Sequence, residues 1–396
     1  MQVTIVGGGF GGVKTALELS KHEKNEVTLI TDKTYFQYYP ALYSSATGRS
    51  HLQSWIPLSE IFGDRTNVTV HIDTITNIDG DKKTLKGESG VTYEYKTCVL
   101  ALGSVTTFFG IKGLDTYAYG IKSAEEIRRL KQHIYHSIAE KGTLDSEYVI
   151  IGGGPTGVEL ASSLGQYIKR LAKRYRVRRH KVKIRLVEAA PRVLPRMNEI
   201  TSDRVTKRLE KLGVVVETNK KVESASVDGL MVSGKEIDTR TVIWTSGVAN
   251  HPFFEKNSKW FKTAPNHKIT VNEHFMAYKD IYVIGDNADT PYSGLAQIAI
   301  RNADELSRNL IRRANGKSMK KYSQSTPAVV IPIGRWWAAF EWKWLRFYGW
   351  PAWIVRMAAD FIGYRDILST SSALAKLRSG ELIEDDYFTP TKSPRK

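Results

Sequence analysis

The apolar and polar positions follow the same order twice along the chain. A short β-branched run is followed by a glycine-rich turn, a helical pattern and a second apolar run that ends at an acid. Short apolar runs bounded by glycine predict buried strands, and apolar residues spaced three or four apart predict a helix. The first strand–turn–helix–strand unit comprises residues 2–6, 7–12, 13–19 and 26–32, and the second comprises residues 148–151, 152–157, 158–161 and 182–188.

Further elements are predicted between and after these two units. Short apolar runs separated by turns in residues 66–99 predict a hairpin or meander that ends in a buried strand, residues 98–103. Ser123, followed three positions later by Glu126, predicts a capped helix over residues 123–141. Helices are also predicted at 199–212 and 295–314, and strands at 242–247 and 280–286.

Both glycine turns have the spacing G-x-G-x-x-G, formed by Gly7, Gly9 and Gly12 and by Gly152, Gly154 and Gly157. In a dinucleotide-binding unit the first glycine permits the tight turn, the second lets the backbone approach a pyrophosphate, and the third lets helix and strand pack closely. The acids that end the units, Asp32 and Glu188, would accept hydrogen bonds from a ribose. A single such turn also occurs in unrelated α/β proteins, whereas two complete units imply two dinucleotides.

Composition and charge narrow the class of protein. A chain of 396 residues predicts two or three domains, and the single cysteine, Cys98, excludes a disulfide framework, a cysteine-rich metal site and a redox-active dithiol. We expect no metal. We also expect no signal or transit peptide, because the first strand begins at residue 2, and no membrane-spanning helix, because no window holds eighteen uninterrupted apolar residues.

The net charge of +17 is concentrated in residues 169–185, which carry ten lysines and arginines and no acid. Such a run can bind anionic lipid, nucleic acid or an acidic partner, or it can be a solvated helix end and loop. A second unusual region lies near the C-terminus, where six of the nine tryptophans fall between Trp336 and Trp353 among basic residues. This pattern predicts an interfacial membrane-binding surface, with a buried aromatic core or a dimer interface as the alternative. The last ten residues are expected to form a frayed tail.

A family resemblance rests on several motifs together. The two units, the strand end at Gly285–Asp286 and the strand end at residues 101–103 resemble the two-dinucleotide flavoprotein reductases. Within these the chain most resembles the type II NADH dehydrogenases, which are single-subunit NADH:quinone oxidoreductases. The motifs that carry this closer resemblance are residues 39–43 (YPALY), 46–48 (ATG), 157–159 (GVE), 244–247 (WTSG), 296–299 (AQIA) and 349–353 (GWPAW).

Two positions depart from the pattern of that family. Arg301 stands where many relatives have a second glutamine, which leaves the type of quinone open. Leu102 stands in an Ala-Leu-Gly strand end where Ala-Thr-Gly is commoner, and we interpret this as a local packing change.

The resemblance implies FAD on the first unit, with the Asp286 carboxylate bonding the ribityl chain, and NADH on the second. An acid at position 188 favours NADH, because the 2′-phosphate of NADPH would meet a like charge, although Arg185 and Arg192 lie nearby. Glu159 is implied at the contact of nicotinamide and flavin; the alternative is an acid that stabilises a helix N-terminus. Gln297 is implied at the quinone head group, with a surface glutamine as the alternative.

The implied site residues therefore form two groups. The catalytic residues are Glu159 and Gln297. The cofactor-binding residues are Gly7, Gly8, Gly9, Phe10, Gly11, Gly12, Asp32, Lys33, Pro40, Ile75, Ala101, Gly103, Asp286, Ala296, Gly152, Gly154, Pro155, Thr156, Gly157, Glu188 and Gly247. The aromatic loop of residues 35–43 is expected to line the flavin pocket; the alternative is a purely structural role in packing.

The expected fold is α/β, with two Rossmann-like dinucleotide-binding domains. An FAD-binding domain, residues 1–115 and 270–326, is interrupted by an NADH-binding domain, residues 116–269, and is followed by a C-terminal amphipathic membrane-anchoring segment, residues 327–396. The implied activity is electron transfer from NADH to a membrane quinone, ubiquinone or menaquinone, without proton pumping. The implied location is the cytoplasmic face of the cell membrane, where the protein would bind the lipid bilayer surface peripherally, with a homodimer left open.

Two other functions are compatible with the two dinucleotide units. One is a soluble NAD(P)H-dependent flavoprotein reductase of an iron–sulfur protein, which the basic run could dock. The other is a flavoprotein similar to apoptosis-inducing factor that binds nucleic acid through residues 169–185. We do not expect nucleic acid, because Tyr175 is the only aromatic residue in that run that could stack on bases. Disulfide reductases and sulfide:quinone reductases are excluded because they need paired cysteines near the flavin.

Overall fold

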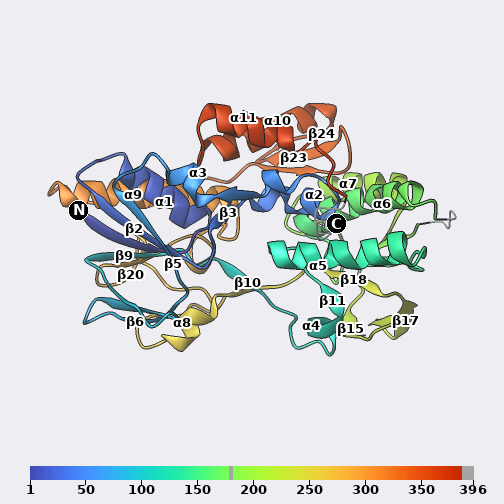
Figure 1. Cartoon of the computed structure of the whole chain (residues 1–396), viewed down its shortest axis with the longest axis horizontal. Coiled ribbons are helices and arrows are strands. Elements are labelled where there is room, and N and C mark those ends of the chain that lie inside the picture. Colours follow the sequence, from blue (N-terminus) through green and yellow to red (C-terminus); the bar gives the residue numbers. More distant parts are fainter. Residues whose placement is uncertain (178–181, 386–396) are drawn as a thin grey trace, which may run out of the picture.

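The computed structural model of the chain describes residues 1–177 and 182–385 and places the first predicted unit in a twisted sheet (Figure 1). The strand order is β20 (Met276–Tyr278), β21 (Ile281–Val283), β9 (Thr97–Leu100), β1 (Gln2–Val6), β2 (Glu26–Thr31) and β5 (Val68–Ile72). All neighbours pair in parallel except β20, which pairs antiparallel with β21 at the edge. The carboxyl ends of β1, β2, β9 and β21 therefore meet at one edge of the sheet, where α/β proteins bind ligands.

A second parallel sheet is inserted between β9 and β20 of the first. Its strand order is β11 (Ala118–Tyr119), β18 (Thr241–Trp244), β12 (Tyr148–Ile151), β13 (Ile184–Val187) and β14 (Val214–Glu217). The two chain connections between the sheets pair with each other as antiparallel strands, β10 (Ser104–Thr106) and β19 (Val248–Asn250). The α/β fold with two Rossmann-like domains, the first interrupted by the second, is confirmed, while the residue numbers of the domain boundaries stay a prediction.

The helices that follow the glycine turns cover the sheets. α1 (Phe10–Ser20) lies against α9 (Ala296–Ala314), and both contribute to the apolar core of the first sheet. α6 (Pro155–Arg174) buries one apolar stripe in the core of the second sheet and leaves a basic end exposed. The helix predicted at 123–141 is α5 (Ala124–Tyr135), with the capping box of Ser123 and Glu126 formed, and it continues as a π-helical turn, His136–Glu140.

The segment predicted as one meander divides between two sheets. β5 and β9 join the first sheet, and only β6 (Ile75–Asp79), β7 (Thr84–Gly87) and β8 (Thr92–Glu94) form the antiparallel meander. The reason is burial, because Cys98, Val99 and Leu100 are fully buried. Both faces of β9 must therefore be covered, as they are in a parallel sheet between layers, whereas a small antiparallel meander leaves a face exposed to solvent.

The remaining elements connect or cover these layers. They are β3 (Tyr35–Gln37), η1 (Tyr39–Ala41), α2 (Leu42–Ala46), η2 (His51–Gln53), β4 (Trp55–Pro57), α3 (Leu58–Phe62), α4 (Leu114–Tyr117), α7 (Glu199–Lys211), β15 (Val222–Ala225), β16 (Gly229–Val232), β17 (Lys235–Asp238), α8 (Pro252–Lys256) and η4 (Gly285–Asn287).

The C-terminal region folds back over both domains. It consists of β22 (Val329–Pro332), β23 (Ala338–Trp342), β24 (Leu345–Gly349), α10 (Trp350–Arg365) and α11 (Thr370–Ser379), drawn in orange and red in Figure 1. The ring of Tyr364 stacks on that of Tyr38 with centroids 4.1 Å apart, and Ile367 belongs to the core of the first sheet. Asp385 then pairs with Arg170 of α6 at 2.6 Å. The region is therefore an integral part of the fold, not a detachable appendage.

Two tryptophans of the cluster are partly buried, and the other four are exposed. Trp337 packs against the second core, and Trp353 packs against the sheet of β22 to β24, as the aromatic-core alternative expected. Trp336, Trp342, Trp344 and Trp350 are each between 42% and 81% exposed. In the described part of the chain no helix combines the length and apolar character needed to cross a membrane. The predicted frayed tail and the centre of the basic run, residues 178–181, lie outside the described residues.

Candidate functional site

A cavity of about 480 Å³ opens at the carboxyl ends of β1, β2, β9 and β21, beside the first glycine turn. It brings together most residues that the sequence assigned to the first nucleotide, as the wall of a single cavity. Its lining includes Gly7, Gly8, Gly9, Phe10, Gly11, Asp32, Lys33, Ile75, Ala101, Gly103, Asp286 and Ala296. Thr156 from the second glycine turn also lines the cavity, so both predicted nucleotide-binding turns reach it.

The three motif glycines of the first turn have different surroundings. Gly7 adopts a φ of +113°, which side chains rarely allow. A Cβ on Gly12 would lie 1.8 Å from the Gly7 carbonyl oxygen, so only glycine lets α1 pack against the turn. A Cβ on Gly9 would meet no protein atom within 4 Å. The space beside Gly9 is thus open on the cavity side, which fits a cradle for a ligand's pyrophosphate.

The strand end at Gly285–Asp286 is locked to the end of β9. The Asn287 side chain donates to the Gly103 carbonyl at 2.7 Å and accepts from the Gly103 N–H at 2.8 Å. This exchange fixes the backbone on both sides of Asp286. The Asp286 carboxylate accepts a hydrogen bond from Ser104 Oγ at 2.9 Å and lines the cavity.

The second glycine turn repeats the geometry of the first. Gly152 has a φ of +112°, a Cβ on Gly157 would lie 1.8 Å from the Gly152 carbonyl oxygen, and a Cβ on Gly154 would meet nothing within 4 Å. The Glu188 carboxylate accepts from the backbone N–H of Gly153 at 2.5 Å and from that of Ala190 at 2.7 Å. Glu188 therefore holds the turn as well as presenting its charge there.

The two arginines near Glu188 are bound elsewhere. Arg185 Nε donates to Glu147 at 2.6 Å, and its guanidinium also pairs with Glu217. Arg192 donates to the carbonyl oxygens of Met197 and Pro195. Neither guanidinium pairs with the Glu188 carboxylate, so the negative charge beside the second turn stays uncompensated by them.

Glu159 belongs to a buried charged cluster that joins three segments of the chain. Arg356 of α10 lies 3.3 Å from the Glu159 carboxylate and 2.7 Å from that of Asp360, and it donates to the Pro40 carbonyl at 3.0 Å. Burial raises the pKa of Glu159 to about 8, because desolvation disfavours the charged carboxylate; the attraction of Arg356 lowers this pKa, and the negative charge of Asp360 raises it. Glu159 and Pro40 are not among the residues that line the cavity.

Gln297 and Arg301 connect α9 to the segment that precedes β22. Gln297 Nε2 donates to the Ala328 carbonyl at 2.7 Å, and Arg301 Nη1 donates to Ser325 Oγ at 2.9 Å. Gln297 is half-buried, and its neighbour Ala296 lines the cavity. Gly247, with a φ of +78°, packs against Phe109 and Thr107 at the connection between the sheets. The functional roles of all these residues stay predictions.

Sequence reasoning missed several polar residues of the cavity lining, among them Ser104, Lys122 and His251. Each follows the carboxyl end of a strand, β9, β11 and β19 respectively. Because ligands of α/β sheets bind at such ends, a list of polar residues after every predicted strand would have included Ser104, which follows the strand predicted at residues 98–103, but not Lys122 or His251. The short strands β11 and β19 lack the long apolar run that would have made them visible in the sequence.

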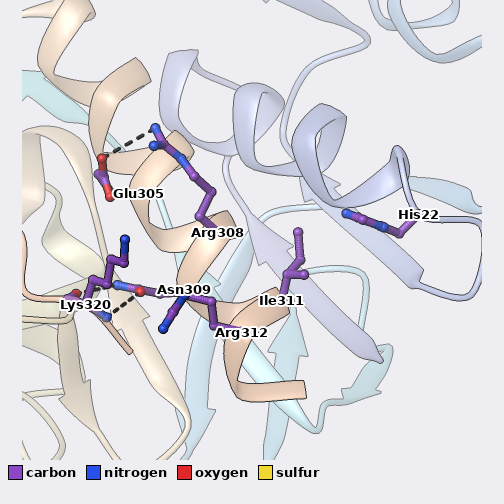
Figure 2. A pocket seen from close by; sticks show the side chains of 7 residues that line it. All are labelled: His22, Glu305, Arg308, Asn309, Ile311, Arg312 and Lys320. Atoms are coloured by element: carbon purple, nitrogen blue, oxygen red, sulfur yellow. Dashed lines mark hydrogen bonds and ion pairs between the residues drawn. The ribbon is translucent and has the colours of Figure 1, made fainter. Parts of the chain in front are cut away.

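A second pocket, of about 370 Å³, lies over the carboxyl half of α9 (Figure 2). It is lined by His22, Glu305, Arg308, Asn309, Ile311, Arg312 and Lys320. Glu305 pairs with Arg308 at 3.4 Å, and Asn309 accepts from the Lys320 N–H at 2.8 Å. This pocket includes none of the predicted site residues, and it is not at the carboxyl edge of either sheet.

Residues 1–177 and 182–385 contain no candidate metal site and no pair of cysteines. No group of three or more His, Cys, Asp or Glu side chains in these ranges is placed to hold a metal ion. Cys98 is fully buried in β9, and burial raises the pKa of its thiol. A buried, protonated thiol without a second cysteine cannot form a redox-active disulfide within the chain.

Comparisons with known proteins agree with this geometry. Residues 1–303 match the family model described as pyridine nucleotide-disulphide oxidoreductase. A type II NADH:quinone oxidoreductase of Staphylococcus aureus is 28% identical over 359 residues, which cover 84% of this chain and 87% of the relative.

Solved structures with the same fold include NDH2 from Plasmodium falciparum in complex with NADH, with a TM-score of 0.84, 19% identity and coverage of 96% of this chain and 97% of that one. The sulfide:quinone oxidoreductase of Aquifex aeolicus has a TM-score of 0.74 at 19% identity, covering 96% of this chain and 92% of that one.

Proposed function

Because the chain belongs to the pyridine nucleotide-disulphide oxidoreductase family, we propose that it is an FAD-dependent enzyme that transfers electrons from NADH to a membrane quinone without pumping protons. The observation that carries this proposal is the single cavity that both glycine turns reach. Two nucleotides bound on these turns would meet there, as hydride transfer between them requires. The relative from Staphylococcus aureus is named for the same activity.

FAD fits the residues of the cavity. Gly9, Asp32 and Asp286 all line the cavity; the open space beside Gly9 would accept the pyrophosphate, Asp32 would bind the adenosine ribose and Asp286 would bind the ribityl chain. When bound, the flavin supplies the chemistry, since it accepts a hydride from NADH and passes the electron pair to the quinone. The residues of the two glycine turns would position both nucleotides in the cavity.

The quinone would approach at the N-terminus of α9. Ala296 lines the cavity there, and Gln297 links the helix to the C-terminal region through Ala328. The amide oxygen of Gln297 and the guanidinium of Arg301 are the polar groups available to a quinone carbonyl or quinol hydroxyl. Both ubiquinone and menaquinone carry such carbonyl groups, so these residues do not distinguish between the two substrates.

NADH rather than NADPH is the proposed donor, because the charge of Glu188 is not neutralised by Arg185 or Arg192. We expect Glu188→Ala to raise KM for NADH. The preference for NADH over NADPH, measured as the ratio of the two kcat/KM values, should narrow by about 1–3 kcal/mol. Glu188→Gln is the matched control, because it keeps an acceptor for the Gly153 N–H and removes only the charge. Steady-state kinetics with both donors measure the ratio, and an unchanged ratio in both variants would contradict the assignment.

A peripheral position on the cytoplasmic face of the membrane is proposed from the exposed aromatic residues of the C-terminal region. Trp336, Trp344 and Trp350 are 53%, 81% and 66% exposed, and exposed tryptophans near basic residues favour the bilayer interface. The basic end of α6 would add electrostatic attraction to anionic lipid headgroups. A second copy of the chain as a partner stays a prediction.

Replacing Trp336, Trp344 and Trp350 together with serine is expected to abolish sedimentation with lipid vesicles while FAD stays bound. Activity with a short-chain soluble quinone should survive, because these side chains lie outside the cavity lining. Val227→Ser, at an equally exposed apolar residue between β15 and β16, is the control and should leave sedimentation unchanged. Vesicle binding that persists in the triple variant would contradict the membrane surface.

The steady-state rate at which the purified enzyme oxidises NADH, measured with and without a short-chain quinone, tests the proposed function itself. We expect rapid NADH oxidation that depends on quinone and on bound FAD. Rapid reduction of a ferredoxin with negligible reduction of quinone would instead favour the soluble reductase of an iron–sulfur protein.

A further inference from the structure

Gly48 ends the Ala-Thr-Gly motif of residues 46–48 and lies where three parts of the chain meet. Its φ is +82°, and a Cβ added there would lie 2.7 Å from the Asp385 carboxylate and 2.7 Å from the Tyr167 ring, besides colliding with the Arg170 guanidinium. Both the backbone conformation and the crowding therefore require glycine. The motif does not line the cavity of the first glycine turn, so its glycine serves a contact between segments and not a nucleotide.

The three parts belong to different regions of the fold. Gly48 follows α2 of the first domain, which contains the cavity, and Asp385 belongs to the C-terminal region. Tyr167 and Arg170 lie in α6 of the second domain, whose first turn follows Gly154. α2 packs against both α5 and α6 (Figure 1). The junction around Gly48 is therefore an attachment between the two domains that is separate from the connection formed by β10 and β19.

Residues 381–385 form a segment that we call the strap, and they bind the loop after α2. The strap backbone forms two antiparallel hydrogen bonds with residues 48–50, of 3.0 and 3.1 Å. The Glu384 carboxylate accepts hydrogen bonds from the Ser50 hydroxyl at 2.9 Å and from the His51 N–H at 2.7 Å. These bonds fasten the strap to the first domain.

The same strap binds two helices of the second domain. Lys131 of α5 donates to the Glu384 carbonyl at 2.7 Å. Arg170 of α6 binds the Asp385 carboxylate through Nη2 at 2.6 Å and Nε at 3.0 Å, and it also donates to the Thr47 carbonyl at 3.3 Å. Asp385 is only 3% exposed, and a buried carboxylate is costly without its cation, so this pair holds the end of α6 firmly.

The position of α6 decides where the second glycine turn lies. Gly154 precedes the first residue of α6, and Arg170 lies in the last part of the same uninterrupted helix of 20 residues. Such a helix is about 30 Å long, and it moves as one rod. Thr156 in its first turn lines the cavity, so a shift of α6 changes the distance between the two nucleotide sites. Hydride transfer is sensitive to such a shift, because the reacting atoms must come within about 3–3.5 Å.

We propose that Arg170 and Asp385 are positioning residues that set how closely the second domain approaches the first, and thereby place the nicotinamide of NADH against the flavin. This inference rests on the proposed function, because FAD and NADH are the nucleotides of that function. Neither residue lines the cavity, so each acts through α6 and the second glycine turn. The alternative is a purely structural pair that stabilises the fold, with the domain arrangement set by the β10–β19 connection alone.

The test is the anaerobic rate at which saturating NADH bleaches the flavin of the purified holoenzyme. Arg170→Gln and Asp385→Asn should each slow this step about tenfold, while the flavin content stays that of wild type. With NADH that carries deuterium at the transferred position, the isotope effect on steady-state turnover should rise, because hydride transfer becomes rate-limiting. A purely structural pair would lower the unfolding temperature and leave the saturating rate and the isotope effect of the folded enzyme unchanged.

Two further variants complete the comparison. Lys169→Gln removes a charge from an exposed side chain next to Arg170 and is the matched control, so its flavin should bleach at the wild-type rate. Arg170→Lys keeps the charge but loses the planar, two-nitrogen contact with Asp385. Its rate should lie between those of wild type and Arg170→Gln. This milder change also decides the outcome if the neutral variants fail to fold.

Hydrogen exchange gives a readout that does not depend on turnover. In holoenzyme carrying Arg170→Gln or Asp385→Asn, the backbone amides of β10 and β19 should exchange faster than in wild type, because the domains can move about this connection once the strap no longer holds α6. Lys169→Gln should exchange as wild type does.

The results separate the inference from the function on which it rests. Folded variants at Arg170 and Asp385 that bleach at the wild-type rate, or equal slowing in Lys169→Gln, would overturn the positioning role and leave the proposed function intact. A wild-type flavin that NADH does not bleach would overturn both.

Discussion

Arg356→Met is expected to lower the free energy of unfolding by about 3 kcal/mol, the low end of the range for breaking a buried ion pair. The guanidinium of Arg356 lies between the carboxylates of Glu159 and Asp360 and holds the Pro40 carbonyl. Its removal leaves buried acceptors without a donor. The cost stays at the low end because Glu159, whose pKa is about 8, can keep its proton. Thermal unfolding should shift down by several degrees.

Loss of FAD should accompany this loss of stability, since Arg356 fixes the segment of residues 39–41 whose Tyr39 lines the cavity. Arg365→Met is the matched control on the same helix, because Arg365 is exposed, and its effect should stay within about 0.5 kcal/mol. Equal stability of the two variants would mean that the cluster does not hold the C-terminal region to the two domains.

Gly9→Ala is expected to remove FAD from a folded protein, and Gly154→Ala is expected to leave FAD bound while raising KM for NADH at least tenfold. A Cβ at either position meets no protein atom within 4 Å, and neither glycine needs a positive φ. Both substitutions therefore cost the fold little. Any large effect comes from the added methyl group meeting a nucleotide.

The flavin content and the kinetics of the two variants distinguish the two turns directly. Gly12→Ala is a poor test of binding, because its Cβ would lie 1.8 Å from the Gly7 carbonyl and disrupt packing. If Gly9→Ala kept its flavin and Gly154→Ala lost it, the assignment of FAD to the first unit and NADH to the second would be reversed.

The sequence predicted the parts of the fold that depend on local pattern. The glycine spacing of Gly7 to Gly12 and of Gly152 to Gly157 places two turns whose geometry nearly coincides in the structure. The capping box of Ser123 and Glu126 is likewise a short-range signal, and it formed as expected. These features need only neighbours within a few residues, so one sequence contains all the information required.

Contacts between distant segments were not predictable in the same way. Arg356 and Glu159 lie 197 positions apart, and nothing near either residue in the sequence indicates the other. For the same reason the sequence pattern of residues 327–396 was interpreted as a separate membrane-anchoring segment. In the structure, Tyr364, Ile367 and Ala373 of this segment belong to the core of the first sheet. Deleting that whole region would therefore expose the core, and substitution of the exposed tryptophans is the better test of membrane binding.

The most direct test of electron transfer through FAD is an anaerobic titration of the purified protein followed by flavin absorbance. One equivalent of NADH should bleach the flavin band of the bound cofactor, and one equivalent of a short-chain quinone should then restore it. Cys98→Ser should behave in the same way, because Cys98 is buried in β9 and has no second thiol. A flavin that NADH cannot bleach, or that quinone cannot restore once it is bleached, would contradict the transfer of electrons from NADH to quinone through FAD.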